Sequence, residues 1–320
     1  MQNIERSPRP LRHPNRLLDA IHRFLDGDVF HSFKQSPVVI VAFIVTALMF
    51  LAAIFAPWLA PHDTSDIASL DLMNAFRPPA WAAGGASTFP LGTDDQGRDV
   101  LSAIMFGLRL SLYVGFASVI LAAIVGTALG LLSGYIGGVL DSVIMRIADI
   151  QLTFPAILIA LLFDGIMRSV LPSHIHSEFK ITVLILAIAA SKWVDFARTV
   201  RATTMVEKNK EYVQAARVIG IHPILIMIRH VMPNIMGPVL VIGTLNLAIN
   251  ILTEATLSFL GVGVPVTLPS LGTLIRIGND FLFSGEWWMT IFPGIALVVL
   301  VLAVNLLGDW LRDALNPKLR

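Results

Sequence analysis

Residues whose side chains could hold a metal or perform catalysis are sparse in this sequence. His174, His176 and Glu178 form an H-x-H-x-E run, and an extended strand could aim all three side chains at one metal ion. The alternative is a solvated polar loop, and we expect no metal site here. Neither H-E-x-x-H nor G-x-S-x-G occurs, so the sequence offers no zinc-activated water and no nucleophilic serine. We therefore expect no catalytic residues.

The stretch GTDDQGRD at residues 92–99 superficially suggests a phosphate-binding loop. Gly92 and Gly97 have the required gap, but such a loop needs Lys and then Ser or Thr after the second glycine. Here Arg98 and Asp99 follow instead. The chain is therefore expected to bind no ATP, and any energy for its work comes from a partner.

A polar stripe crosses one of the most apolar parts of the chain. Asn246, Asn250 and Thr253 are spaced i, i+4 and i+7, with Glu254 beside them. Polar groups inside a membrane are costly and often line a transport pathway. Alternatively, they hydrogen-bond to neighbouring helices and fix the packing, and the residues alone leave both interpretations open.

Composition places these residues in a membrane protein. Of the 320 residues, 55% are hydrophobic and only 14% are charged, and the mean hydropathy is +0.75. Such values are too apolar for an ordinary soluble domain. A net charge of +1 gives no support for nucleic-acid binding. The absence of cysteine excludes disulfides, thiol catalysis and Cys-ligated metal sites.

The apolar runs predict an all-α, polytopic membrane protein. Backbone groups in lipid must be satisfied within each segment, so the spans should be helices. The third and fourth spans are less apolar than the others. The third contains Arg146 and Asp149, and the fourth contains Lys192 and Asp195. We predict six transmembrane helices at residues 38–60, 111–134, 143–163, 181–197, 235–262 and 289–309.

Basic residues predict the orientation of these spans. Sixteen Lys and Arg residues fall on the side that holds both termini and six on the other, with Lys192 inside a span. The positive-inside rule then places both termini in the cytoplasm. The external segments are residues 61–110, 164–180 and 263–288, and the first is either an ordered cap or a mobile loop. The polar, basic residues 1–36 are not expected to be a cleaved signal peptide.

Two features predict how the spans pack and bend. Gly126, Gly130 and Gly134 repeat a G-x-x-x-G spacing, which lets helices approach closely in lipid. The close contact lies either inside the subunit or with a partner. Pro155 should kink the third span, because proline removes one backbone hydrogen bond.

The stretch EYVQAARVIGIHPILIMIRHVMP, residues 211–233, interrupts the apolar spans. Tyr212, Ala215, Ala216 and Ile219 are spaced along one helix face, which the two alanines make flat. Gly220 should end this helix, since it tolerates left-handed backbone angles. By physical pattern alone, the loop is either a protein-docking element or an amphipathic helix lying on the membrane.

This loop resembles the EAA loop of ABC importer permeases. That loop carries Glu-Ala-Ala, a glycine four residues later and a Leu-Pro further on. Gln214, Ala215, Ala216 and Gly220 match the first part, with Gln in place of Glu, and Met232-Pro233 matches Leu-Pro. His230 stands where the general pattern has Ile. The phrase RHVMPN is similar to the RHILPN of the dipeptide/oligopeptide branch.

Three further stretches resemble the same branch. They are PLGTDDQGRDVLS at residues 90–102, EATLSFLGVGV at 254–264 and the tail NLLGDWLRDALNPKLR at 305–320. The tail is most similar to that of the C-type permease subunit. The resemblance covers the chain from about Pro37 onward.

The resemblance implies the type I importer permease fold and a transport function. Residues 1–36 would be a cytoplasmic segment, 37–108 the first transmembrane helix and external loop, and 310–320 a cytoplasmic tail. Residues 109–309 would be a permease core of five helices with a coupling loop at 201–234. The residues implied in ATPase coupling are Tyr212, Gln214, Ala215, Ala216, Gly220, His230 and Pro233, and those implied in lining the pathway are Asn246, Asn250 and Thr253.

The implied assembly lies in the bacterial cytoplasmic (inner) membrane, in contact with membrane lipid. This chain would form a heterodimer with a second permease, and one or two cytoplasmic ATPases would use ATP and Mg to drive it. A periplasmic or external binding protein would deliver di- or oligopeptides or a similar small solute. This chain would itself bind no cofactor and no nucleic acid.

Two other classes of protein fit the residues less well. A secondary transporter or channel predicts intramembrane ion relays and inverted repeats, and neither is clear in the sequence. A membrane-embedded enzyme needs a buried catalytic set, yet no His falls within any predicted span.

Overall fold

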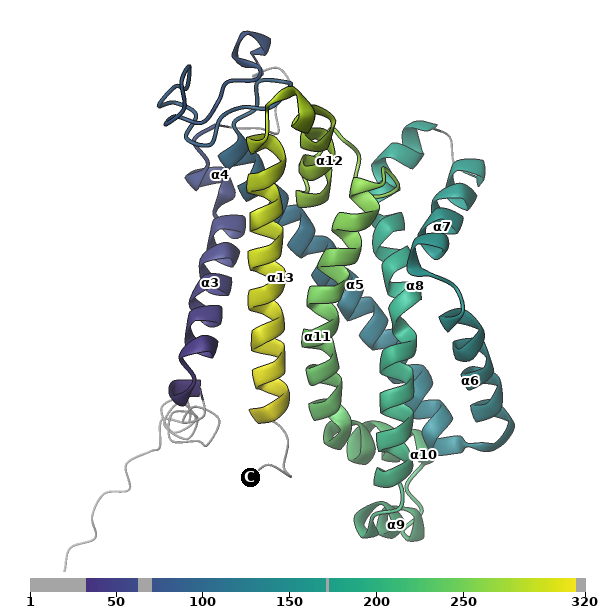
Figure 1. The fold of residues 1–320 in the computed structure, drawn as a ribbon. Helices are drawn as coiled ribbons and strands as arrows, with labels where there is room; N and C mark the ends of the chain where they lie inside the picture. Colours follow the sequence, from purple (N-terminus) through teal and green to yellow (C-terminus); the bar gives the residue numbers. More distant parts are fainter. Residues whose placement is uncertain (1–32, 63–70, 171–172, 315–320) are drawn as a thin grey trace, which may run out of the picture.

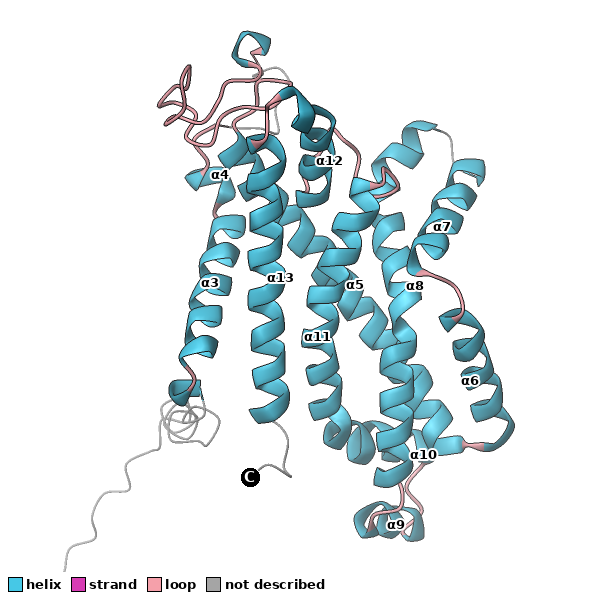
Figure 2. Cartoon of the chain, viewed as in Figure 1, coloured by secondary structure: helices cyan, strands magenta, loops and turns pink. Residues whose placement is uncertain are grey.

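The computed structural model describes residues 33–62, 71–170 and 173–314. This part of the chain is helical and contains no β-strand beyond one isolated bridge between Thr93 and Asp99. Loops gather at the two ends of the bundle, apart from one short loop that lies part-way along it (Figure 2). The eleven labelled helices are α3 (Pro37–Ile54), α4 (Ala56–Leu59), α5 (Val100–Ile136), α6 (Gly138–Leu152), α7 (Ala156–Val170), α8 (Ser173–Glu207), α9 (Glu211–Val218), α10 (Pro223–Ile226), α11 (Met232–Phe259), α12 (Leu271–Phe281) and α13 (Trp288–Ala314). The start of α3, the end of α13 and the short α9 lie at one end of the bundle, and α4 and α12 lie at the other (Figure 1).

The described residues contain four helices that can span a membrane, or five with one bent pair, whereas the sequence predicted six. By length and composition, α3, α5, α13 and the continuous Pro223–Phe259 stretch can each cross a membrane, and the bent pair α6 and α7 can form a fifth span. The predicted span at residues 181–197 lies within α8, which does not meet that criterion. Helix α8 packs along α5 more extensively than any other pair of described helices. It can therefore carry charges, because protein rather than lipid surrounds much of it.

Close packing of α5 on α8 confirms the prediction made from the glycine repeat. An added Cβ would lie 2.4 Å from the Trp193 carbonyl oxygen at Gly126, 2.5 Å from that of Ala197 at Gly130, and 2.7 Å from that of Arg201 at Gly134. The three glycines of α5 and the three facing residues of α8 are each spaced four apart, so the two helices stay in close contact over successive turns. The partner helix belongs to this chain, which decides between the two predicted locations.

Pro155 lies in the break between α6 and α7, whose axes differ by 96°. The predicted kink of the third span is therefore confirmed, and it is sharp enough to separate two helices. Residues 174–178 lie in the first turns of α8, so neither the extended strand nor the polar loop considered for the H-x-H-x-E run is formed. Within the described part of the chain, no group of three His, Asp or Glu residues could hold a metal.

The described part of the first external segment forms an ordered cap. Asp94 pairs with Arg98 at 2.6 Å from Oδ2 to Nε, and its other carboxylate oxygen accepts two backbone N–H groups. Asp99 caps α5 by accepting hydrogen bonds from the backbone N–H and the hydroxyl of Ser102. Trp288, at the start of α13, donates its indole N–H to the Thr93 carbonyl at 3.0 Å. The cap thus fixes the external ends of α5 and α13 relative to each other.

Candidate functional site

Helix α9 is the centre of the predicted docking loop, and its end is defined by backbone geometry. Gly220 has φ +79°. Its N–H donates to the Arg217 carbonyl at 3.0 Å, and the next N–H, of Ile221, donates to the Ala216 carbonyl at 3.1 Å. These two bonds form a Schellman cap, which glycine makes at the least steric cost. The sequence prediction that Gly220 ends the helix is confirmed.

The faces of α9 differ in one respect from the predicted docking surface. Tyr212, Ala215 and Ile219 are exposed, and Ile219 keeps 74% of its surface. Ala216 is only 3% exposed, because it lies one turn beyond Val213, and both pack into the main core of the chain. The prediction that Ala216 lies on the free surface is therefore wrong.

The sequence reasoning also missed one member of the exposed face. Val218 is 87% exposed and neighbours Ala215 at i+3. Together, Tyr212, Ala215, Val218 and Ile219 form what we call the α9 apolar face. The signal was present, since Val218 is apolar and lies three residues after Ala215, but it falls outside the arc that the i, i+3, i+4, i+7 template covers.

Tyr212 joins α9 to the two long helices on either side of the loop. Its hydroxyl donates to the Glu207 carboxylate at the end of α8. Asn234 of α11 donates its amide to the Tyr212 oxygen at 3.1 Å and to the His230 carbonyl at 2.7 Å. Lys210 pairs with Glu207 at 2.8 Å. We call Glu207, Lys210, Tyr212 and Asn234 the Tyr212 hub.

Electrostatics in the Tyr212 hub favour one protonation state. Burial and the neighbouring Glu207 carboxylate raise the pKa of Tyr212 to about 12. Burial also works to raise the pKa of Glu207, but hydrogen bonds from Lys210 and Tyr212 outweigh it and hold that pKa below its usual value. At neutral pH the hub therefore holds a neutral phenol against a charged carboxylate.

The other predicted docking residues occupy the rest of the loop. Gln214 is exposed and donates its amide to the Lys208 carbonyl at 3.2 Å. His230 lies in a π-helical turn, Met227–Val231, and its Nδ1 is buried without a hydrogen-bond partner among the described residues. Pro233 is exposed in the first turn of α11, where proline is tolerated. The structure thus brings Tyr212 and His230 together and leaves Gln214 apart from them.

A second set of contacts fastens the loop to the end of α5. The Lys208 ammonium donates to the carbonyl oxygens of Gly134 at 2.6 Å and Tyr135 at 3.3 Å. The Arg217 guanidinium lies 5.1 Å from the centre of the Tyr135 ring. A lysine at a helix C-terminus satisfies its last carbonyls. No sequence signal predicts these contacts, because more than 70 residues separate the partners.

The polar stripe of α11 is mostly buried within this chain. Asn250 is fully buried and donates its amide to the Ser118 hydroxyl of α5 at 3.0 Å. Asn246 is 4% exposed, and Thr253 is partly exposed. Beside them, Glu254 accepts hydrogen bonds from Ser111 at 2.7 Å and Ser258 at 2.8 Å. These are the contacts expected of the packing alternative, and the pathway role of the stripe stays a prediction.

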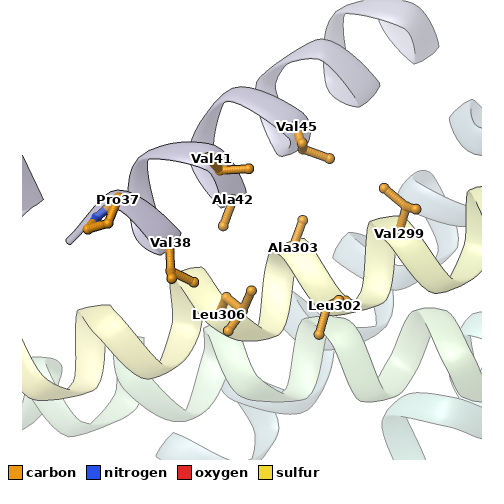
Figure 3. Close-up of a pocket in the computed structure, with 9 residues that line it drawn as sticks. All are labelled: Pro37, Val38, Val41, Ala42, Val45, Val299, Leu302, Ala303 and Leu306. Carbon is orange, nitrogen blue, oxygen red and sulfur yellow. The ribbon is translucent and has the colours of Figure 1, made fainter.

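A groove of about 390 Å³ lies between α3 and α13 and is unsuited to a peptide (Figure 3). Every residue that lines it is apolar, so nothing there orients charged or hydrogen-bonding groups. Both helices are candidate membrane spans, and the groove therefore suits hydrocarbon chains. Its lining residues are Pro37, Val38, Val41, Ala42, Val45, Val299, Leu302, Ala303 and Leu306.

Comparisons with known proteins agree with the architecture and the loop. Residues 126–320 match the family described as binding-protein-dependent transport system inner membrane component. Residues 27–79 match the N-terminal TM domain of oligopeptide transport permease C.

Relatives align with almost the whole chain. The chain is 40% identical to the dipeptide transport system permease protein DppC of Haemophilus influenzae, over 90% of this chain and 93% of that protein. It is 40% identical to the Escherichia coli DppC over 92% of this chain and 93% of the relative. It is 36% identical to the oligopeptide transport system permease protein OppC of Bacillus subtilis, over 92% of this chain and 90% of that protein.

A solved structure shows the fold. A chain of the inward-facing MetNI methionine ABC transporter superposes with a TM-score of 0.53 at 17% identity, covering 67% of this chain and 96% of that one.

Proposed function

The chain belongs to the family of binding-protein-dependent transport system inner membrane components, and we propose that it carries di- or oligopeptides across the membrane. It is a multi-pass membrane permease of an ABC importer. As a transport subunit it is not an enzyme, and ATP hydrolysis belongs to a separate subunit. The peptide substrate is proposed because the DppC and OppC relatives are named as dipeptide and oligopeptide transport permeases.

The chain acts with another permease, an ATPase and a binding protein. In detail, we propose a heterodimer of two permeases, driven by one or two cytoplasmic ATPases that use ATP and Mg. A periplasmic or external binding protein delivers the peptide. This chain itself needs no bound cofactor for that work.

The proposed orientation places the α9 end of the bundle in the cytoplasm of a bacterial cell. Two observations support it. The start of α3 and the end of α13 lie at the same end as α9 (Figure 1). The sequence distribution of Lys and Arg, sixteen on the side of both termini against six on the other, also assigns that side to the cytoplasm. An ATPase in the cytoplasm would then meet α9 directly.

The observation that carries the proposal is the combination of an exposed apolar face with a fixed base. The α9 apolar face leaves large side chains in solvent, which marks a surface for a partner. The same helix is held to α8 and α11 by the Tyr212 hub and to α5 through Lys208. A push on α9 is therefore transmitted to three long helices as a rigid-body movement.

The proposed pathway follows from that movement. Asn250 is buried between α5 and α11, and Asn246 is buried one turn before it, so they would line a pathway only when α11 moves away from its neighbours. Thr253 is partly exposed already. We place the pathway beside this part of α11.

Purification of the intact assembly tests the proposed function. The chain, tagged and extracted in mild detergent from its own membrane, should bring along a second permease and one or two ATPases. After reconstitution with the binding protein into liposomes, we expect uptake of a labelled dipeptide only with ATP and Mg. A chain that purifies alone under all salt and nucleotide conditions, with uptake driven by an ion gradient, would overturn the proposal.

A further inference from the structure

Lys180 lies within electrostatic range of three other charged residues, from two other helices, at the end of the bundle opposite α9. Asp164 and Arg168 belong to α7, Lys180 to α8 and Arg276 to α12. Arg168 pairs with Asp164 at 2.7 Å. The Lys180 ammonium lies within electrostatic range of Asp164, Arg168 and Arg276. Arg168 and Lys180 thus share one carboxylate, Arg276 adds a third cation, and the group, which we call the α7–α8–α12 basic cluster, has a net charge of +2.

Two of these cations lack a counter-ion of their own. Lys180 and Arg276 are both partly buried. No ion pair or side-chain hydrogen bond joins either of them to another residue that the structure describes. Arg168, by contrast, is mostly exposed and already paired. Taking an unpaired cation out of water is costly, and such residues in membrane proteins commonly mark the path of a charged substrate.

The Arg276 side chain packs against the backbone turn at Gly261. Its Nη1 would lie 2.5 Å from a Cβ added at Gly261, so the guanidinium rests on a backbone that only glycine leaves free. Gly261 has φ +82° and ends α11. Helix α12 in turn begins with a capping box between Ser270 and Thr273. Arg276 therefore projects from a fixed helix onto a fixed turn.

We propose that Lys180 and Arg276 form an anion site that takes the C-terminal carboxylate of a peptide at the external mouth of the permease. The inference rests on the proposed peptide function. A guanidinium presents paired N–H donors that match a carboxylate, and an ammonium adds a second positive charge. Arg168 keeps Asp164 occupied, which leaves the other two cations for the substrate. A lipid phosphate offers the same chemistry, so the test separates the two sources.

The test compares one dipeptide as free acid and as C-terminal amide. Uptake of both is measured in liposomes that contain the complete complex, the binding protein, ATP and Mg. The binding protein can itself prefer one form, but it is common to all samples, so a change in the acid-to-amide ratio belongs to the permease. In Lys180→Gln and Arg276→Gln we expect this ratio to fall about tenfold, through slower uptake of the acid. Arg109→Gln is the matched control, because Arg109 is exposed on α5 outside the cluster.

Chemical restoration of the charge provides a second arm. The chain has no cysteine, so Lys180→Cys introduces its only thiol, and the wild-type complex controls for thiols in other subunits. An aminoethyl thiosulfonate, which forms a disulfide that carries an ammonium, should restore the ratio. A sulfonatoethyl reagent, which adds a negative charge, should not. Restoration would also show that the Cys variant is folded.

Each outcome decides the proposal. A fall in acid uptake with unchanged amide uptake supports it. A parallel fall for both peptides overturns it and points to a lipid phosphate or a structural role, and an unchanged ratio also overturns it. If the wild-type complex takes up neither peptide form, the proposed function itself fails, and that failure is visible without any variant.

Discussion

The external cap and the α9 loop sit at opposite ends of α5, and they are built in opposite ways. In the cap, Asp94, Arg98 and Asp99 are each at most 4% exposed and bond to other parts of the cap. In the loop, the Tyr212 hub is partly open to solvent, and none of the residues that the structure describes covers the α9 apolar face. The cap is closed on itself, whereas the loop is closed only on the side that faces its own helices.

This difference separates the two tasks of a coupled membrane protein. A buried ion pair is costly to break, so the cap fixes the external ends of α5 and α13. A partly exposed hub is worth less, yet it keeps α9 attached while leaving its outer face free. We infer that the cap maintains the shape of the bundle and that the loop receives force from a partner. Substitutions in the cap should therefore reduce folding, and those on α9 should reduce transport.

Asp94→Ala is expected to have the largest effect. It leaves the Arg98 guanidinium buried without its carboxylate and removes two backbone bonds. Breaking such a pair costs roughly 3–5 kcal/mol, which would unfold much of the chain. Thermal unfolding of the purified subunit and its level in the membrane measure this. Asp71→Ala is the control, because Asp71 is exposed in the same cap. If Asp94→Ala unfolded at the wild-type temperature, the claim that the cap maintains the shape of the bundle would be wrong.

Ala215→Asp should strongly reduce transport while the chain stays folded. It puts a carboxylate at the centre of the α9 apolar face, where docking would desolvate it without a partner. We expect ATP-dependent uptake to fall by at least about tenfold. Uptake and co-purification of the ATPase measure the loss, with Ala215→Ser as control.

The neighbouring alanine sharpens this prediction. Ala216→Asp should lower transport and the unfolding temperature together, because Ala216 is buried against its own core. If Ala215→Asp kept full uptake, α9 would not be the docking element. If both variants lost stability equally, the division between the two alanines would be wrong.

Local patterns allowed much of the fold to be predicted from the sequence. The glycine repeat of α5, the break at Pro155 and the end of α9 at Gly220 depend on neighbouring residues or on steric limits of one residue type. The helical class follows from the apolar runs, since lipid leaves the backbone few alternatives. The H-x-H-x-E run was misread, because a polar segment beside an apolar helix can simply extend that helix.

Contacts between distant residues limited the prediction of the site. The bond between Asn234 and Tyr212 joins residues 22 apart, and that between Lys208 and Gly134 joins residues 74 apart. Neither partner of such a pair has a local pattern that identifies the other. Burial of Ala216 was missed for the same reason, since it depends on which side of α9 the core occupies. Asn250 is ambiguous because pathways and packed interiors both contain asparagine.

Tyr212→Phe should have a smaller effect than either aspartate. It keeps the ring on the α9 apolar face and removes the hydroxyl that bonds Glu207 and Asn234. A hydrogen bond of this kind contributes about 0.5–1.5 kcal/mol, so we expect uptake to fall about two- to tenfold with little change in unfolding temperature. Tyr135→Phe is the matched control, because Arg217 contacts the Tyr135 ring and the ring is retained. Equal uptake in both variants would show that the hub does not transmit force.

The smallest expected effect is on the pH dependence of the hub. The pKa of Tyr212 is raised to about 12, so its contribution to stability is complete below the ordinary value of 10.0 and is lost as pH rises through 12. The pKa of Glu207 is lowered, so its contribution is present above the ordinary value of 4.5 and is lost as pH falls below it. Between these limits the hub does not titrate, and between pH 6 and 8 it should add no pH dependence to uptake.

Tyrosine ring carbon NMR of a Tyr113→Phe, Tyr135→Phe variant measures the pKa of Tyr212 directly. Adding Glu207→Gln should return that pKa toward 10, since the neighbouring negative charge is removed while a hydrogen-bond acceptor remains. A Tyr212 pKa that is ordinary before this change would mean that the hub is open in the free chain and closes only when the ATPase docks.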